Sequence, residues 1–152
     1  MLKRAKLKVN KKLKIEFKKK NIIKYNPRKK FDLIISMLVL DHIKNLKKVI
    51  SIIDKASKKG TIVVISNIHP DLIYQHYIKT GKGQGFLIDN YITDQFYHPL
   101  EEYVDLFLEK GFNLIKTENI NFEKKYYNIK RFKGVAIFKD RPVGIIMKFK
   151  KN

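Results

Sequence analysis

The chain of 152 residues is long enough for one domain with a hydrophobic core, and its apolar content of 44% argues against disorder. It contains no cysteine, no signal-peptide core and no apolar run of the about 18 residues that a membrane span needs, so we expect a cytoplasmic protein without disulfides or thiolate metal sites. The net charge of +20 suits nucleic-acid or acidic partners, although most of the basic residues are lysines scattered along the chain, as solvated surface residues are.

The N-terminal residues predict two short elements. Apolar residues recur at a weak helical spacing over residues 1–9, without a capping residue in front of them. Apolar and polar residues then alternate over Leu13–Phe17, which predicts a short strand with one solvent-exposed face. Asn26 and Pro27 favour a turn, so the next element is expected to begin after them.

A complete strand–helix–strand unit follows. Phe31–Leu40 and Thr61–Ser66 are apolar runs of the kind found in parallel strands that are buried on both faces. Asn45 is placed to cap the intervening helix and Gly60 to end it. The apolar stripe of that helix comprises Leu46, Val49, Ile50, Ile53 and Ala56. Because such a crossover returns the chain parallel to itself, the two strands are predicted to be neighbours in an α/β sheet.

Residues 69–98 have a different character, with three of the four histidines, several tyrosines and the glycine-rich stretch 81–85. We expect a long excursion over one end of the sheet, where α/β proteins keep their binding residues. The histidines His69, His76 and His98 are separated by 7 and 22 residues, which matches no compact metal-ligand motif, so no metal site is predicted.

The remaining residues predict a helix and two strands. Pro99 favours the start of a helix, two glutamates follow in its first turn, and Gly111 lies just past its end. The strands are expected over Phe112–Thr117 and Val143–Phe149, with a third short strand over residues 134–138.

Several stretches, taken together, carry a resemblance to a known family. They are Met1–Lys6, LKIEF followed by Lys18–Ile22, FDLIISMLVLDHI, Lys59-Gly60 before TIVVIS, His69-Pro70, Tyr97–Leu100 and Gly111-Phe112. In this order and spacing the chain resembles the C-terminal part of a class I S-adenosylmethionine-dependent methyltransferase of the small-molecule, type 11-like group. The resemblance covers essentially the whole chain.

The resemblance implies a partial Rossmann-like fold, in which residues 1–152 form a single truncated methyltransferase-like domain and 69–98 is a long insertion over the carboxyl end of the sheet. It implies a sheet of parallel strands with a C-terminal antiparallel hairpin. The first βαβ unit would lie before Met1, with its glycine-rich turn and acidic ribose-binding residue. The expected strand order is Phe31–Leu40, Thr61–Ser66, Val143–Phe149, Phe112–Thr117.

Without its central neighbours, Phe31–Leu40 would be a long apolar edge strand. Three outcomes are open: the strand Leu13–Phe17 covers this edge, a second polypeptide or self-association covers it, or the reading frame is a remnant or begins too far downstream.

The resemblance also implies roles for individual residues. Asn21 and Ile22 would lie beside the adenine of S-adenosylmethionine, and Met37 and Leu38 would contact the cofactor or belong to the core. His42 would lie near the transferred methyl group, where it could orient or deprotonate a substrate, or it would bond to local backbone. On the substrate side the candidates are His69, Tyr97 and His98, the last two alternatively capping the next helix. The Gly81–Gly85 stretch is expected to be a loop crossing the site rather than a cofactor loop.

Two functions follow. The first is methyl transfer from S-adenosylmethionine to a small-molecule acceptor, with activity of the chain alone left open because most cofactor-binding residues would precede Met1. The alternative is a basic module that binds nucleic acid or an acidic partner, which the 30 lysines permit and the scarcity of arginine does not favour.

Overall fold

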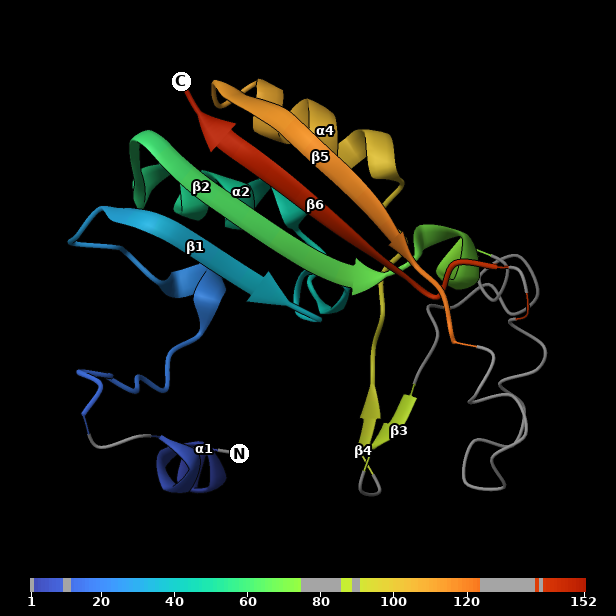
Figure 1. Ribbon diagram of the computed structural model, residues 1–152, viewed down its shortest axis with the longest axis horizontal. Helices are drawn as coiled ribbons and strands as arrows, with labels where there is room; N and C mark the ends of the chain where they lie inside the picture. Colours follow the sequence, from blue (N-terminus) through green and yellow to red (C-terminus); the bar gives the residue numbers. More distant parts are fainter. Residues whose placement is uncertain (1, 10–11, 75–85, 89–90, 124–138, 140) are drawn as a thin grey trace.

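The sheet has four strands in the order β1-β2-β6-β5 (Figure 1). The computed structural model describes residues 2–9, 12–74, 86–88, 91–123, 139 and 141–152. β1 and β2 run parallel, whereas β2 with β6 and β6 with β5 are antiparallel. This confirms the predicted strand order and the parallel pairing of the two apolar runs. The strands span Phe31–Met37 (β1), Ser57–Ile68 (β2), Phe112–Ile120 (β5) and Gly144–Lys151 (β6).

Two helices cover the same face of this sheet, α2 (Leu46–Lys55) and α4 (Leu100–Leu108). Their apolar sides meet the inward-facing residues of β2 and β6 in one core, in which Ile50, Val63, Phe107 and Phe149 are fully buried. Because the helices and strands alternate along the chain and share one core, the predicted α/β class holds.

The opposite face of the sheet is uncovered along β1. Leu33, Ile35 and Met37 project from this face and are 53%, 57% and 67% exposed. The prediction that the strand is buried on both faces is therefore wrong, because no helix or strand among the described residues packs there. The prediction of an exposed apolar edge strand is confirmed.

The boundaries around β1 and β2 differ from the predicted ones. β1 ends at Met37 rather than Leu40, because Leu38 takes a left-handed backbone conformation with φ of 51° and a short 3-10 helix, η2 (Leu40–His42), follows. Gly60 does not end the helix but lies inside β2, with φ of 83°. The pairing of β1 with β2 shifts register between Phe31 and Leu33. The β2 backbone at this irregularity takes a positive φ at Gly60, a conformation that glycine adopts readily.

The N-terminal helix is present as α1 (Leu2–Lys8), and it lies apart from the sheet in Figure 1. The predicted strand Leu13–Phe17 is not formed. An alternating pattern makes a strand only beside a pairing partner, and here Leu13 and Ile15 are exposed. A 3-10 helix, η1 (Ile22–Lys24), packs against α2 and leads into β1.

Parts of the excursion after β2 are described. Residues 70–74 are helical, and β3 (Phe86–Ile88) pairs with β4 (Tyr91–Thr93) as an antiparallel hairpin. His76, the glycine-rich stretch 81–85 and the predicted third strand at 134–138 lie outside the described residues. Within the described part of the chain, no helix has the length and hydropathy to span a bilayer.

Asn45 caps α2 as predicted, because its Oδ1 accepts a hydrogen bond from the backbone N–H of Lys48 at 2.9 Å. We expect Asn45→Ala to lower the free energy of unfolding by about 1 kcal/mol, the usual loss when a capping side chain is removed. Chemical denaturation measures this change. Asn45→Asp is the control, since it keeps an accepting oxygen, and a loss of equal size in both variants would contradict the capping role.

Candidate functional site

The carboxyl end of the parallel pair β1/β2 is where α/β sheets bind ligands. At this end the left-handed turn at Leu38 leaves Met37 and Leu38 exposed, and η2 then places His42 next to the segment that follows β4. The His42 Nδ1 lies 2.7 Å from the carbonyl oxygen of Asp94. Because a carbonyl only accepts, Nδ1 carries the hydrogen of the neutral ring, and Nε2 is left with the lone pair that a general base needs.

Beside His42 the structure buries a polar cluster that the sequence analysis missed: Asp41, Asn67, Gln95 and Tyr103. Gln95 Nε2 donates to Asp41 Oδ2 at 3.0 Å, and Asn67 Nδ2 donates to the Tyr103 hydroxyl at 3.0 Å. One sequence feature could have indicated this cluster. Asp41 and Asn67 are the polar residues that directly follow the two apolar runs of the parallel strands.

The electrostatics of this cluster keep Tyr103 in its neutral form. Burial raises the pKa of the Tyr103 hydroxyl strongly, and the nearby carboxylates of Asp41 and Glu102 raise it further. The hydroxyl therefore stays protonated at physiological pH and acts as a hydrogen-bonding group rather than a base. One oxygen each of Asp41, Asn67 and Gln95 has no partner within the described residues, so the cluster holds more acceptors than donors.

The two residues predicted beside adenine lie on a different element from Met37 and Leu38. Asn21 precedes η1 and is exposed, and its Oδ1 accepts a hydrogen bond from the Ile23 backbone N–H at 3.0 Å. Ile22 is the first residue of η1 and is also exposed. The Asn21 carbonyl oxygen is thus engaged locally, whereas its amide nitrogen has no partner within the described residues.

The three predicted substrate-side residues have different surroundings. His98 is buried, and its ring nitrogens contact the carbonyl oxygen of Ile43 at 2.8 Å and the Glu102 carboxylate at 3.0 Å. Neither nitrogen is free for a substrate, and the contact with Glu102 ties His98 to the first turn of α4. His98 does not cap this helix, because no described side chain makes a capping hydrogen bond to its first backbone N–H groups. Tyr97 lies half-buried with its ring 5.0 Å from that of Tyr74.

Desolvation is the main cause that raises the pKa of the Tyr97 hydroxyl, so Tyr97 is a neutral donor as well. The third residue, His69, lies on the loop after β2, and its Nδ1 is 3.5 Å from the Asp71 carboxylate. His69 and Tyr97 keep surfaces that a ligand can reach, whereas His98 does not.

At the opposite end of β1 a surface ion pair joins the two parallel strands. The Lys58 ammonium lies 2.6 Å from the Asp32 carboxylate and lowers the pKa of that exposed carboxyl group. A lowered pKa in the folded state means that the contribution of the pair to stability is present above the unfolded pKa and is lost as the pH falls through the folded value. The pair thus links the starts of β1 and β2.

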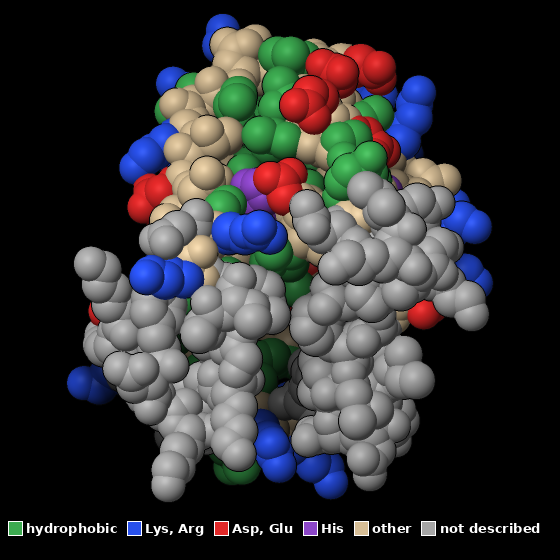
Figure 2. Space-filling view, turned by 90° about the vertical axis from the view of Figure 1, so that its right-hand side faces the viewer, with side chains coloured by type: hydrophobic (Ala, Val, Ile, Leu, Met, Phe, Trp, Pro, Cys, Tyr) green, Lys and Arg blue, Asp and Glu red, His purple; other side chains and the backbone are tan. Residues whose placement is uncertain are grey.

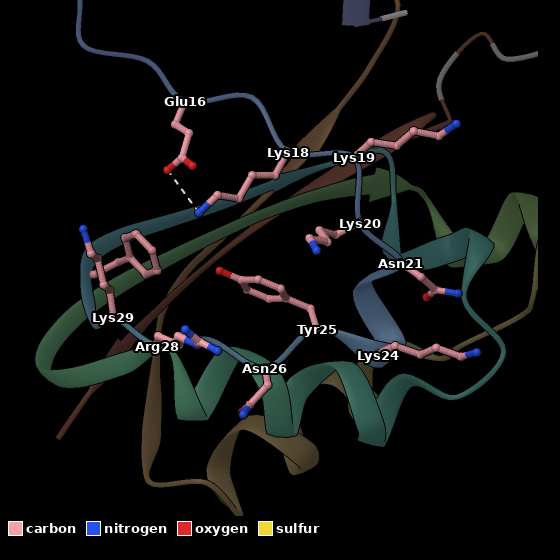
Figure 3. A pocket seen from close by; sticks show the side chains of 11 residues that line it. Glu16, Lys18, Lys19, Lys20, Asn21, Lys24, Tyr25, Asn26, Arg28 and Lys29 are labelled. Carbon is pink, nitrogen blue, oxygen red and sulfur yellow. Dashed lines mark ion pairs between the residues drawn. The ribbon is translucent and has the colours of Figure 1, made fainter.

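A cavity of about 900 Å³ opens between residues 16–29 and the start of β1 (Figure 3). Asn21 lines it, together with the ring of Tyr25 and several cationic side chains, whereas Met37, Leu38 and His42 do not. Basic side chains also lie on both flanks of the face shown in Figure 2. Within the described residues, no group of histidine, aspartate and glutamate side chains could hold a metal ion.

A family model described as a methyltransferase domain matches residues 4–117 of the chain. The fold is similar to an S-adenosylmethionine-dependent methyltransferase from Mesorhizobium loti, at 15% identity and a TM-score of 0.72, with 99% of this chain and 76% of that chain covered. It is similar to a protein from Listeria monocytogenes described as a candidate methyltransferase of the same kind, at 15% identity and a TM-score of 0.76, with 100% and 76% covered.

A third similar structure contains a cofactor product. It is the N-methyltransferase NodS from Bradyrhizobium japonicum in complex with S-adenosylhomocysteine, at 11% identity and a TM-score of 0.52, with 87% of this chain and 52% of that chain covered. At these identities the likeness shows the fold. A search of the curated proteins finds no match.

Proposed function

The chain belongs to the S-adenosylmethionine-dependent methyltransferase domain family, and from this premise we propose that it takes part in methyl transfer to a small-molecule acceptor in the cytoplasm. The observation that carries the proposal is the ligand-accessible carboxyl end of β1, where Met37, Leu38 and His42 follow one another at the edge used by α/β enzymes.

The residues present fit one side of the cofactor. Met37 and Leu38 offer exposed apolar surface, and Ile22 on η1 is exposed as well. The Asn21 amide nitrogen, which has no partner within the described residues, can donate to an adenine ring nitrogen. When bound, S-adenosylmethionine supplies an electrophilic methyl group on a sulfonium. Positioning of the acceptor against that methyl group is the main task left to the protein.

His42 is the proposed base. Its Nδ1 is fixed by the Asp94 carbonyl, so its Nε2 would be able to take the proton that an acceptor N–H or O–H loses on methylation. His69 and Tyr97, at the ends of the insertion 69–98, are proposed to orient the acceptor. We assign His98 to the fold rather than to the substrate, because its ring nitrogens are both engaged.

We further propose that the sheet is completed at β1, by a second polypeptide, by further residues of the same protein or by a second copy. Parallel strands are normally buried on both faces, and β1 instead exposes Leu33, Ile35 and Met37 beside a free edge. In this proposal residues 1–152 provide one part of the methyltransferase fold. A second polypeptide or further residues of the same protein would supply the glycine-rich and ribose-binding elements, whereas a second copy of this chain would only cover the edge.

The first test is isothermal titration of S-adenosylhomocysteine into the purified chain at moderate salt. We expect saturable binding in the micromolar range that is weakened at least about tenfold by Met37→Asp, because a carboxylate replaces apolar cofactor surface. Leu108→Asp, which alters another exposed apolar side chain, on α4, is the control and should bind normally.

The absence of binding by a folded chain would overturn cofactor binding by this chain alone. In that case the completing polypeptide would be required before any activity is measured.

A second candidate function is the binding of a polyanion, either nucleic acid or an acidic partner. The cationic cavity beside Tyr25 favours it specifically. Salt separates the two functions, since phosphate binding weakens steeply as salt rises and binding of a cofactor to an apolar, hydrogen-bonded site does not.

A further inference from the structure

The cavity beside β1 is more cationic than the rest of this basic chain. Six of the eleven residues that line it are lysine or arginine, compared with 34 of the 152 residues overall, and Glu16 is the one carboxylate among them. The cationic residues are Lys18, Lys19, Lys20, Lys24, Arg28 and Lys29. A general excess of lysine therefore does not account for the lining.

Most of this charge is not neutralised by the protein. Glu16 pairs with Lys18 at 3.0 Å, and none of the other five cations forms an ion pair among the described residues. All six side chains are exposed. Exposed cations that converge on one concave surface attract a polyanion and release its counterions when it binds.

Aromatic surface lies within the same cavity. Figure 3 shows the Tyr25 ring between the 16–20 segment and Arg28, in the middle of the cationic side chains. Phe31, at the start of β1, lines the cavity as well and is 41% exposed. The side-chain amides of Asn21 and Asn26 add groups that both donate and accept.

We propose that the cavity formed by residues 16–31 binds single-stranded nucleic acid, with the lysines on the phosphates and Tyr25 stacked on a base. This inference rests on the second proposed function, polyanion binding, and gives it a site and a ligand class. A groove that combines tracking cations with aromatic rings is the arrangement by which proteins hold single strands without sequence preference. An acidic peptide would use the cations but has no need of the ring, so Tyr25 favours the nucleic acid.

The test uses fluorescence anisotropy of a fluorescein-labelled oligothymidylate of about twelve nucleotides, a length typical of single-strand sites. We expect binding that weakens about 100-fold between about 50 mM and 200 mM salt if about five phosphates are contacted. The triple variant Lys18→Gln, Lys19→Gln, Lys20→Gln should lower the salt slope by about 2, and Tyr25→Ala should weaken binding about tenfold at either salt concentration.

The matched control replaces three exposed lysines outside the cavity: Lys47→Gln, Lys148→Gln and Lys150→Gln. It removes the same charge as the cavity variant. Because these lysines lie outside the cavity, the salt slope should stay almost unchanged. Far-UV circular dichroism of each variant verifies the fold.

Two results would overturn the site while polyanion binding stands: equal losses in the cavity and control triple variants, or an unchanged affinity of Tyr25→Ala together with equally strong competition by polyglutamate. The second result would assign the cavity to an acidic protein. If the oligonucleotide and polyglutamate both fail to bind at the lower salt concentration, polyanion binding itself fails, and the methyltransferase proposal is unaffected.

Discussion

Replacement of Phe107 by alanine is expected to lower the free energy of unfolding by about 3–5 kcal/mol, the usual range for removal of a fully buried phenylalanine. Phe107 belongs to α4, has no exposed surface and packs in the core between this helix and the sheet. Its ring stacks on Phe149 with centroids 4.1 Å apart and meets the edge of Phe112 at 5.2 Å. Alanine at this position therefore leaves a cavity beneath two aromatic rings that cannot collapse into it without moving β5 and β6.

Chemical denaturation of the parent chain and the variant measures this loss. Because small domains are stable by only about 5–15 kcal/mol, a loss of this size is a large share of the total stability. Leu108→Ala is the control, since Leu108 is the next residue of the same helix and is 49% exposed. It should change stability by less than about 1 kcal/mol, and similar losses in the two variants would show that α4 does not pack as described.

The parts of the fold that could be predicted from the sequence are those with strong local patterns. The apolar runs of β1 and β2 and the stripe of α2 specify a strand–helix–strand unit, because period and length identify each element. The family resemblance, rather than local pattern, supplied the strand order. Leu13–Phe17 was wrongly predicted as a strand since alternation does not reveal whether a pairing partner exists. The conformations of Leu38 and Gly60 depend on tertiary register, which no local pattern encodes.

The candidate site could be predicted less well. The family resemblance, rather than a local pattern, singled out Met37 and His42, and the structure places both at the carboxyl end of β1, while their roles stay predictions. The sequence could not reveal that His98 uses both ring nitrogens inside the protein, since the partner carbonyl at Ile43 is distant in the chain. The cluster around Asp41 and Gln95 was missed for the same reason.

If the parent chain self-associates through β1, Ile35→Lys is expected to lower the association constant at least about tenfold. Ile35 is 57% exposed, and its neighbours on the same face of the strand, Leu33 and Met37, are exposed as well. A second copy that pairs with the free edge would bury this apolar surface and satisfy the unpaired backbone groups of β1. A lysine at the centre of the strand places a charge in that interface and opposes edge-to-edge pairing, as charged residues do on natural edge strands.

Sedimentation equilibrium over a range of protein concentrations measures the association constant. The control is Ile115→Lys, on β5 at the other edge of the sheet, where the isoleucine is 51% exposed. β5 is an exposed strand that already carries the charged residues Lys116 and Glu118. A further lysine there should therefore leave association through β1 unchanged. A parent chain that stays monomeric at all concentrations, or equal effects of the two variants, would exclude self-association through β1. The edge would then be left for a different polypeptide to complete, and the search for cofactor binding would begin with that polypeptide present.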